Sequence, residues 1–187
     1  MKPVILRRDP LSTGYVKVSR LRIRLARGAE IDREVEAHGD AVAVLPYDAT
    51  RRCALVVRLF RATVLEAAGL PLLEEACAGM IEDGDPDATV RREAEEELGL
   101  RLHALEFVAK VWPSPGISTE TAALYLAPYE PGDRTGPGGG LAEENEDITV
   151  VERPLVELGA EAAEGRIADG KLLTLVLALR LRRPDLF

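Results

Sequence analysis

The chain has 187 residues, of which 47% are apolar and 30% charged, so its length suits one globular domain, or two at most, with a core of ordinary size. Its net charge of -8 excludes a general binder of nucleic-acid polymers, because such a protein needs a basic surface. No apolar run reaches the length of a membrane span and the N-terminus is polar, so we expect no membrane partner and no secretory signal. The two cysteines lie in apolar stretches outside any CxxC pair, which predicts buried free thiols in a cytoplasmic protein.

The beginning of the chain has the pattern of strands. Residues 15–25 alternate apolar and charged side chains, which predicts one strand, and residues 32–37 predict a second. We therefore expect an antiparallel hairpin arm over residues 1–38 and a separate domain over residues 39–187. An isolated hairpin with apolar side chains is difficult to stabilise alone, so the arm also predicts a homodimer.

The rest of the chain mixes strands and helices. A helix is predicted from Pro86 to about Leu98, because Asp85 suits the N-cap, a proline suits the first turn and Gly99 suits the C-terminal cap. The other predicted strands cover residues 41–46, 53–61, 101–112, 121–127 and 148–151, and the other helices cover residues 155–164 and 171–182. Residues 130–140, rich in glycine and proline, predict a loop. This order predicts an α/β domain with a mixed sheet and flanking helices.

The predicted central helix carries the most informative side chains. Glu93 and Glu97 are one turn apart on one face, with Glu96 beside them, while Val90, Ala94 and Leu98 form an apolar stripe. Like carboxylates at this spacing repel each other unless a cation lies between them, and Mg²⁺ prefers carboxylate oxygens. A solvated acidic face is the alternative interpretation. The charge is concentrated here, because residues 74–97 hold ten acids and two bases while the remaining residues sum to zero.

The block from Arg92 to Leu100, REAEEELGL, with Gly79 ahead of it, resembles the Nudix box. Asp85 stands where the box has a glutamate, and the stretch from Asp85 to Arg92 is one residue shorter than usual. The resemblance implies a Nudix α/β/α sandwich that uses Mg²⁺, or Mn²⁺, to hydrolyse a nucleoside diphosphate linked to another group. It also implies that Arg92 orients the carboxylates. The metal ligands that it implies are Glu93, Glu96, Glu97 and the carbonyl of Ala78.

Flanking segments are similar to the GDP-mannose pyrophosphatase branch of the family, which lies close to the ADP-ribose pyrophosphatases. These segments are residues 73–79, 114–120, 138–140, 146–148 and 169–171. By this resemblance Glu146 is a further metal ligand or the general base, and Glu120 contacts the substrate or the attacking water, so that either carboxylate can take the proton. Arg61 and Lys171 are expected to bind the pyrophosphate or the sugar end. The residues expected to reach the nucleoside across a swapped dimer interface are Tyr15, Arg33 and Glu34.

The leading functional hypothesis is therefore hydrolysis of GDP-mannose to GMP and mannose 1-phosphate. ADP-ribose pyrophosphatase, which would release AMP and ribose 5-phosphate, is the alternative within the family. A non-catalytic nucleotide-sugar-binding module and an acidic interaction domain are the alternatives from other classes. Residues 1–34 carry nine bases and four acids, and a basic arm beside a metal site suits an anionic nucleotide diphosphate.

Overall fold

The computed structural model describes residues 1–82, 84–141 and 146–187 of the chain. These residues form two compact units. The first comprises Met1–Asp40 and Trp112–Thr121, and the second comprises Ala41–Val111 and Ala122–Phe187. The first unit thus contains the expected arm together with a segment from the middle of the chain, which the sequence pattern did not indicate. Whether it acts as a dimerisation arm stays a prediction.

The first unit is built on a three-stranded antiparallel sheet of β1 (Val4–Thr13), β2 (Lys17–Arg24) and β3 (Glu30–Ala37). Strand β1 was not expected, because Arg7, Arg8 and Asp9 interrupt any apolar alternation. Exposed ion pairs join β2 to β3, such as Arg22–Asp32 at 2.9 Å and Arg20–Glu34 at 3.1 Å. Solvent screens such exposed pairs, so their main effect is to fix the register of the two strands.

The second unit contains a mixed sheet in the order β10-β5-β4-β9-β8, with β4 parallel to β9 and the other neighbours antiparallel. Two short strands extend it, β6 along β5 and β7 along β4. The bounds are β4 (Ala41–Asp48), β5 (Cys53–Leu59), β6 (Leu73–Glu75), β7 (Cys77–Met80), β8 (Glu106–Val111), β9 (Ala122–Pro128) and β10 (Thr149–Pro154). The strand predicted over residues 101–112 begins later than expected, since residues 101–105 are not in a strand.

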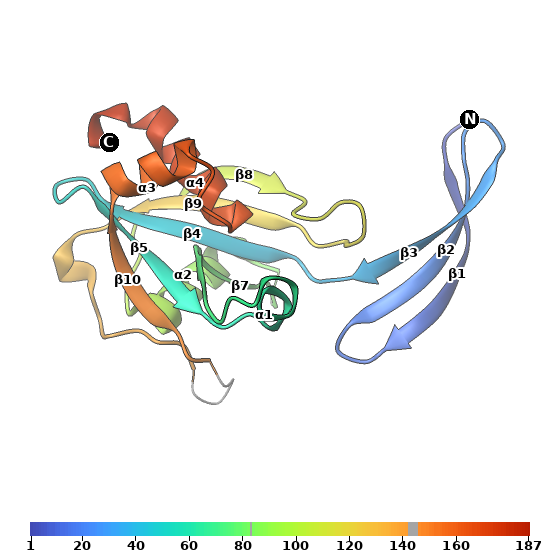
Figure 1. The fold of residues 1–187 in the computed structure, drawn as a ribbon, viewed down its shortest axis with the longest axis horizontal. Coiled ribbons are helices and arrows are strands. Elements are labelled where there is room, and N and C mark those ends of the chain that lie inside the picture. The colour runs from blue at the N-terminus through green and yellow to red at the C-terminus, as the bar shows by residue number, and fades with distance from the viewer. Residues whose placement is uncertain (83, 142–145) are drawn as a thin grey trace. The chain divides into compact units, whose positions relative to one another are not determined.

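Helices cover both faces of this sheet (Figure 1). Val42 and Val44 of β4 pack with α2 on one face, whereas Ala43 and Leu45 pack with α3 and α4 on the other. All eight residues of β4 are buried, because a strand covered on both faces cannot alternate apolar and polar side chains. The helices are α1 (Ala62–Ala68), α2 (Pro86–Leu98), α3 (Leu155–Ala163) and α4 (Gly170–Arg182), with short 3-10 turns η1 (Pro131–Asp133) and η3 (Pro184–Leu186). The expected sandwich is confirmed, and α1 is an addition that the sequence pattern did not indicate.

Helix α2 has the ends that its sequence predicts. The Asp85 carboxylate accepts hydrogen bonds from the backbone N–H groups of Asp87 at 3.0 Å and Ala88 at 3.2 Å. Gly99 ends the helix with a φ of 59°, a left-handed conformation that favours glycine. Leu98 and the rest of the expected apolar stripe are fully buried against the sheet. One face of α2 is thereby fixed, and this determines where its glutamates lie.

The two cysteines are buried free thiols, as the sequence predicts. Among the described residues, no helix is both long and apolar enough to cross a membrane. The cytoplasmic location stays a prediction.

Candidate metal and active site

Glu97 lies at the buried edge of α2, against strand β7. Its side chain is 4% exposed, and its Oε2 accepts a hydrogen bond from the backbone N–H of Ala78 at 3.1 Å. Burial raises the pKa of Glu97 from 4.5 to about 7. The negative charges of Glu93 and Glu146 raise this pKa further, while hydrogen bonds from Cys77 and Ala78 oppose the rise. A bound cation would offset both the desolvation of this carboxylate and its repulsion by the two neighbouring charges.

Glu93 occupies the space that a glycine leaves open. A Cβ atom on Gly79 would lie 2.0 Å from Cδ of Glu93, so only glycine lets the two segments approach this closely. Burial raises the pKa of Glu93 to about 7, although the neighbouring Arg92 lowers it. Glu96 and Glu146 add to the rise through their charges. The spacing of Gly79 and Glu93 in the sequence thus reflects a direct packing contact.

Arg92 holds two of the carboxylates of α2. Its guanidinium donates to Glu93 at 2.7 Å and to Glu96 at 2.6 Å. Asp85, which replaces the usual glutamate of the box, is the N-cap of the helix, and no ion pair joins it to Arg92 in the part of the chain that the structure describes. The shortened spacing therefore leaves the link between Arg92 and the α2 carboxylates intact.

Glu146 reaches the site from a loop whose glycines, residues 136 and 138–140, define what we call the glycine loop. The N–H groups of Gly139 and Gly140 donate to the last carbonyls of α2, on Glu97 at 2.9 Å and Glu96 at 3.1 Å. A Cβ on Gly140 would lie 2.4 Å from Oε2 of Glu146, which itself accepts from the N–H of Leu141 at 3.0 Å. The loop thus ties Glu146 to the end of α2. The sequence indicated a loop here, but only positive φ angles at three consecutive glycines explain its role.

Arg61 and Lys171 converge on a buried acid that sequence reasoning missed. The Glu75 carboxylate is 3% exposed, and it accepts from Arg61 at 2.7 and 3.2 Å and from Lys171 at 3.3 Å. Asp169 binds the same lysine at 2.9 Å and also caps α4. Glu75 raises the pKa of Arg61, and the charge of Glu97 raises it as well, which puts this network beside the α2 carboxylates. Glu75 was missed because it lies among many acids, and only burial distinguishes it.

Four further predicted residues lie in the first unit. Tyr15 is fully exposed and Arg33 donates to the carbonyl of Asp32 at 2.7 Å. Glu34 accepts from Arg20 at 3.1 Å. The backbone N–H of Glu120 donates to the Ser118 hydroxyl at 3.1 Å. The structure thus brings Glu93, Glu96, Glu97, Glu146, Ala78, Arg61 and Lys171 together in the second unit, and describes these four separately.

The carboxylates of the second unit fit a hard divalent cation in their chemistry. The donors are oxygen atoms only, and the partly buried Glu93 and the buried Glu97 have raised pKa values that a bound cation would lower again. As the side chains stand, no three acidic, His or Cys side chains among the described residues enclose a metal position, and Arg92 supplies the positive charge. Arg92 contacts one oxygen of Glu93 and one of Glu96, so metal binding would require the second oxygens of these carboxylates to turn toward a common position.

Comparison with known proteins agrees with this geometry. The NUDIX domain family matches residues 37–175. The chain belongs to the Nudix family. A GDP-mannose pyrophosphatase of Cronobacter sakazakii is 38% identical over 151 residues, which cover 80% of this chain and 78% of that protein. One of Pectobacterium atrosepticum is 37% identical over 145 residues, covering 77% and 74%.

A solved structure described as an ADP compounds hydrolase shares the fold. It superposes with a TM-score of 0.79 at 17% identity, covering 99% of this chain and 96% of that one. The Nudix resemblance and the α/β fold expected from the sequence are both confirmed.

Proposed function

We propose that this Nudix protein hydrolyses the pyrophosphate bond of a nucleotide sugar, with GDP-mannose as the preferred substrate and GMP and mannose 1-phosphate as products. The observation that carries the proposal is a pair of desolvated carboxylates, the partly buried Glu93 and the buried Glu97, whose pKa values are both raised to about 7 beside Glu146. The GDP-mannose pyrophosphatases that are similar over most of the chain support this choice of substrate. Among the sequence hypotheses, an acidic interaction domain would gain nothing from burying these charges.

Four groups would hold the cation, Mg²⁺ or Mn²⁺: the carboxylates of Glu93, Glu96 and Glu97 and the carbonyl of Ala78. When bound, the ion would neutralise pyrophosphate oxygens and make water more acidic. Arg92 would keep the carboxylates oriented, because it already contacts Glu93 and Glu96.

Glu146 is proposed as the general base. It faces Glu93 and Glu97 closely enough to raise the pKa of both, and the glycine loop holds it there. The water oxygen attacks one phosphorus atom, the bridging P–O bond breaks, and Glu146 accepts the proton that the water loses. Glu120 is the competing candidate for this role, and a direct comparison of the two variants distinguishes them.

Arg61 and Lys171 are proposed to bind the pyrophosphate or the sugar end. The Arg61 side chain is 45% exposed, so a ligand can reach it, while Glu75 fixes the orientation of its guanidinium. Two cations beside the acidic site would offset the repulsion between the substrate phosphates and the carboxylates.

The first unit is proposed to form a homodimer contact and to contribute Tyr15, Arg33 and Glu34 to the nucleoside of the partner's substrate. Strand β1 exposes Val4 at 54%, Ile5 at 53% and Leu11 at 46%. Exposed apolar side chains of this kind favour burial against the surface of another chain. Light scattering should give the mass of two chains, and a monomeric mass would contradict the trans contacts.

The test of the function is a panel of nucleotide sugars, assayed for monophosphate release with Mg²⁺ and with a chelator. We expect GDP-mannose to be hydrolysed fastest, and only with the metal. Glu97→Gln should lower kcat by a factor of about 100 or more, whereas Glu95→Gln is the matched control, because Glu95 is an exposed acid of the same helix.

Other outcomes of this panel would change the proposal. Faster turnover of ADP-ribose would reassign the substrate. Binding of nucleotide sugars without turnover of any would indicate a non-catalytic module. A larger loss in Glu120→Gln than in Glu146→Gln would transfer the base role to Glu120.

A further inference from the structure

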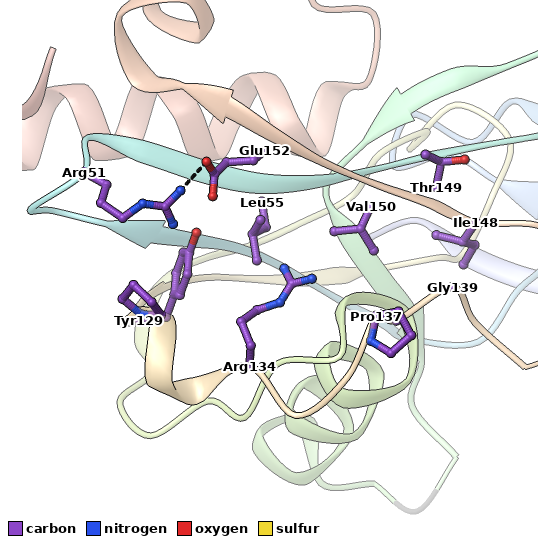
Figure 2. A pocket seen from close by; sticks show the side chains of 12 residues that line it. Arg51, Leu55, Tyr129, Arg134, Pro137, Gly139, Ile148, Thr149, Val150 and Glu152 are labelled. Atoms are coloured by element: carbon purple, nitrogen blue, oxygen red, sulfur yellow. Dashed lines mark hydrogen bonds and ion pairs between the residues drawn. The ribbon is translucent and has the colours of Figure 1, made fainter.

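A cleft of about 690 Å³ lies in the second unit, lined in part by the glycine loop (Figure 2). Leu55, Ile148 and Val150 supply apolar walls, and the buried ring of Tyr129 closes one end. Clefts of this volume with mostly apolar walls and few polar groups suit small organic molecules. None of the residues assigned above to metal, substrate or proton transfer lines this cleft.

The charged groups of the cleft favour an anion. Figure 2 shows Arg51 beside Glu152, to which it is bound, and Arg134 extending from the opposite wall toward Leu55 and Val150. Two guanidinium groups and one carboxylate leave one net positive charge, although the whole chain carries -8. Within the described residues no acid pairs with Arg134. An unpaired guanidinium over an apolar wall is suited to a planar carboxylate.

The cleft is physically connected to the catalytic carboxylates. Gly138 and Gly139 form part of its wall. The same residues also contact α2: the Gly139 N–H donates to the Glu97 carbonyl at 2.9 Å, and a Cβ on Gly138 would lie 2.3 Å from that oxygen. Gly140, the next residue, leaves the space that Glu146 fills. A molecule in the cleft would therefore touch the segment that positions Glu146.

We propose that this cleft is a second small-molecule site that binds a monoanionic organic acid with an apolar or aromatic body, and that its occupant changes the catalytic rate through the glycine loop. The single net positive charge fits a carboxylate better than the dianionic phosphate monoesters that the proposed reaction would release. The second part of the proposal rests on the proposed function, whereas binding itself does not.

Binding is tested on the full-length protein by amide NMR, with phenylpropionate and benzoate as probes and their neutral amides as matched controls. We expect saturable shifts at Gly138, Gly139 and Val150, and at least about tenfold weaker binding of the amides, because a charge-assisted pair is lost. Arg134→Gln should weaken carboxylate binding by a similar factor. Arg101→Gln, which removes the same charge from an exposed position outside the cleft, should leave it unchanged.

Several results would overturn the proposal of a binding site in this cleft. These are no saturable binding at millimolar concentration, equal binding of acids and amides, no effect of Arg134→Gln, or shifts at Ala78 and Glu97 in place of the glycine loop. Tighter binding of GMP or inorganic phosphate at the cleft would overturn the choice of a monoanion.

The coupling has a separate readout. Saturating carboxylate should change kcat for GDP-mannose at least about twofold in the wild type and in Arg101→Gln but not in Arg134→Gln, a threshold below the effect of about fivefold at which typical allosteric couplings begin. An unchanged kcat in the wild type, despite binding, would overturn the coupling. If the protein hydrolyses no nucleotide sugar, the proposed function fails while the binding result still decides the site.

Discussion

Glu97 should make the protein less stable at neutral pH when Mg²⁺ is withheld. Its pKa rises from 4.5 in an exposed chain to about 7 in the fold, so the fold favours the protonated carboxyl group. The contribution of Glu97 to stability is therefore most favourable below about pH 4.5 and falls as the pH rises toward and past 7. A difference of this size corresponds to about 3 kcal/mol, since each pKa unit is worth about 1.4 kcal/mol. The exposed fraction of Glu97 is 4%, so solvent screening reduces this figure little.

Glu97→Gln isolates this effect. The amide keeps an oxygen that can accept from the Ala78 N–H, but it has no charge to desolvate. In urea unfolding with a chelator, the variant should equal the wild type near pH 4.5 and be up to about 3 kcal/mol more stable at pH 8. The effects of other titrating groups largely cancel when the free energy of unfolding of the wild type is subtracted from that of the variant. For Glu95→Gln, this difference should not rise with pH.

Mg²⁺ should reverse the order. The ion binds the folded wild type and stabilises it, whereas the variant has lost a ligand and gains less. A variant that is no more stable than the wild type at pH 8 without metal would show that Glu97 is well solvated, and would refute the reasoning from burial.

Three substitutions test other contacts. Gly79→Ala places a Cβ 2.0 Å from the Glu93 side chain and should lower activity about 10- to 100-fold by displacing that carboxylate, with Mg²⁺ titration as the measurement; unchanged Mg²⁺ dependence would contradict the contact. Gly138→Ala puts a side chain at a φ of 69° against the Glu97 carbonyl and should cost at least about 1 kcal/mol in urea unfolding; a neutral result would mean that the loop moves freely. Asp85→Ala removes the N-cap of α2 and should cost about 1 kcal/mol, which Asp85→Ser should largely restore in thermal unfolding.

The sequence predicted those parts of the fold that depend on local signals. Helix α2 was located to the residue because Asp85, Pro86 and Gly99 mark its ends. Strand β4 was predicted from its apolar run with the correct start at Ala41, but it extends to Asp48, two residues beyond the predicted end. Strand β1 was missed because its charged stretch shows no period, although pairing with β2 satisfies its backbone. Helix α1 is short and has no buried residue, so it carries little periodic signal.

The candidate site likewise has one part that local sequence predicts and another that depends on tertiary contacts. The spacing of Glu93, Glu96 and Glu97 follows from helix geometry and needs no tertiary information. The network of Glu75 with Arg61 and Lys171 depends on segments 96 residues apart in the chain, from Glu75 to Lys171, and no local pattern encodes that contact. The relation of Glu146 to α2 depends on the path of the glycine loop, which follows from backbone angles and not from side-chain type.

The end of α2 has an electrostatic consequence. The peptide dipoles of a helix add up to about half a negative charge at its C-terminus, where basic side chains usually compensate it. Here the last turn holds Glu95, Glu96 and Glu97 and no basic residue. A lysine at that position would be a tethered competitor for any cation that the glutamates attract. Gly139 and Gly140 instead satisfy the terminal carbonyls with uncharged N–H groups, so the negative pole of the helix remains available to draw a metal ion toward the carboxylates.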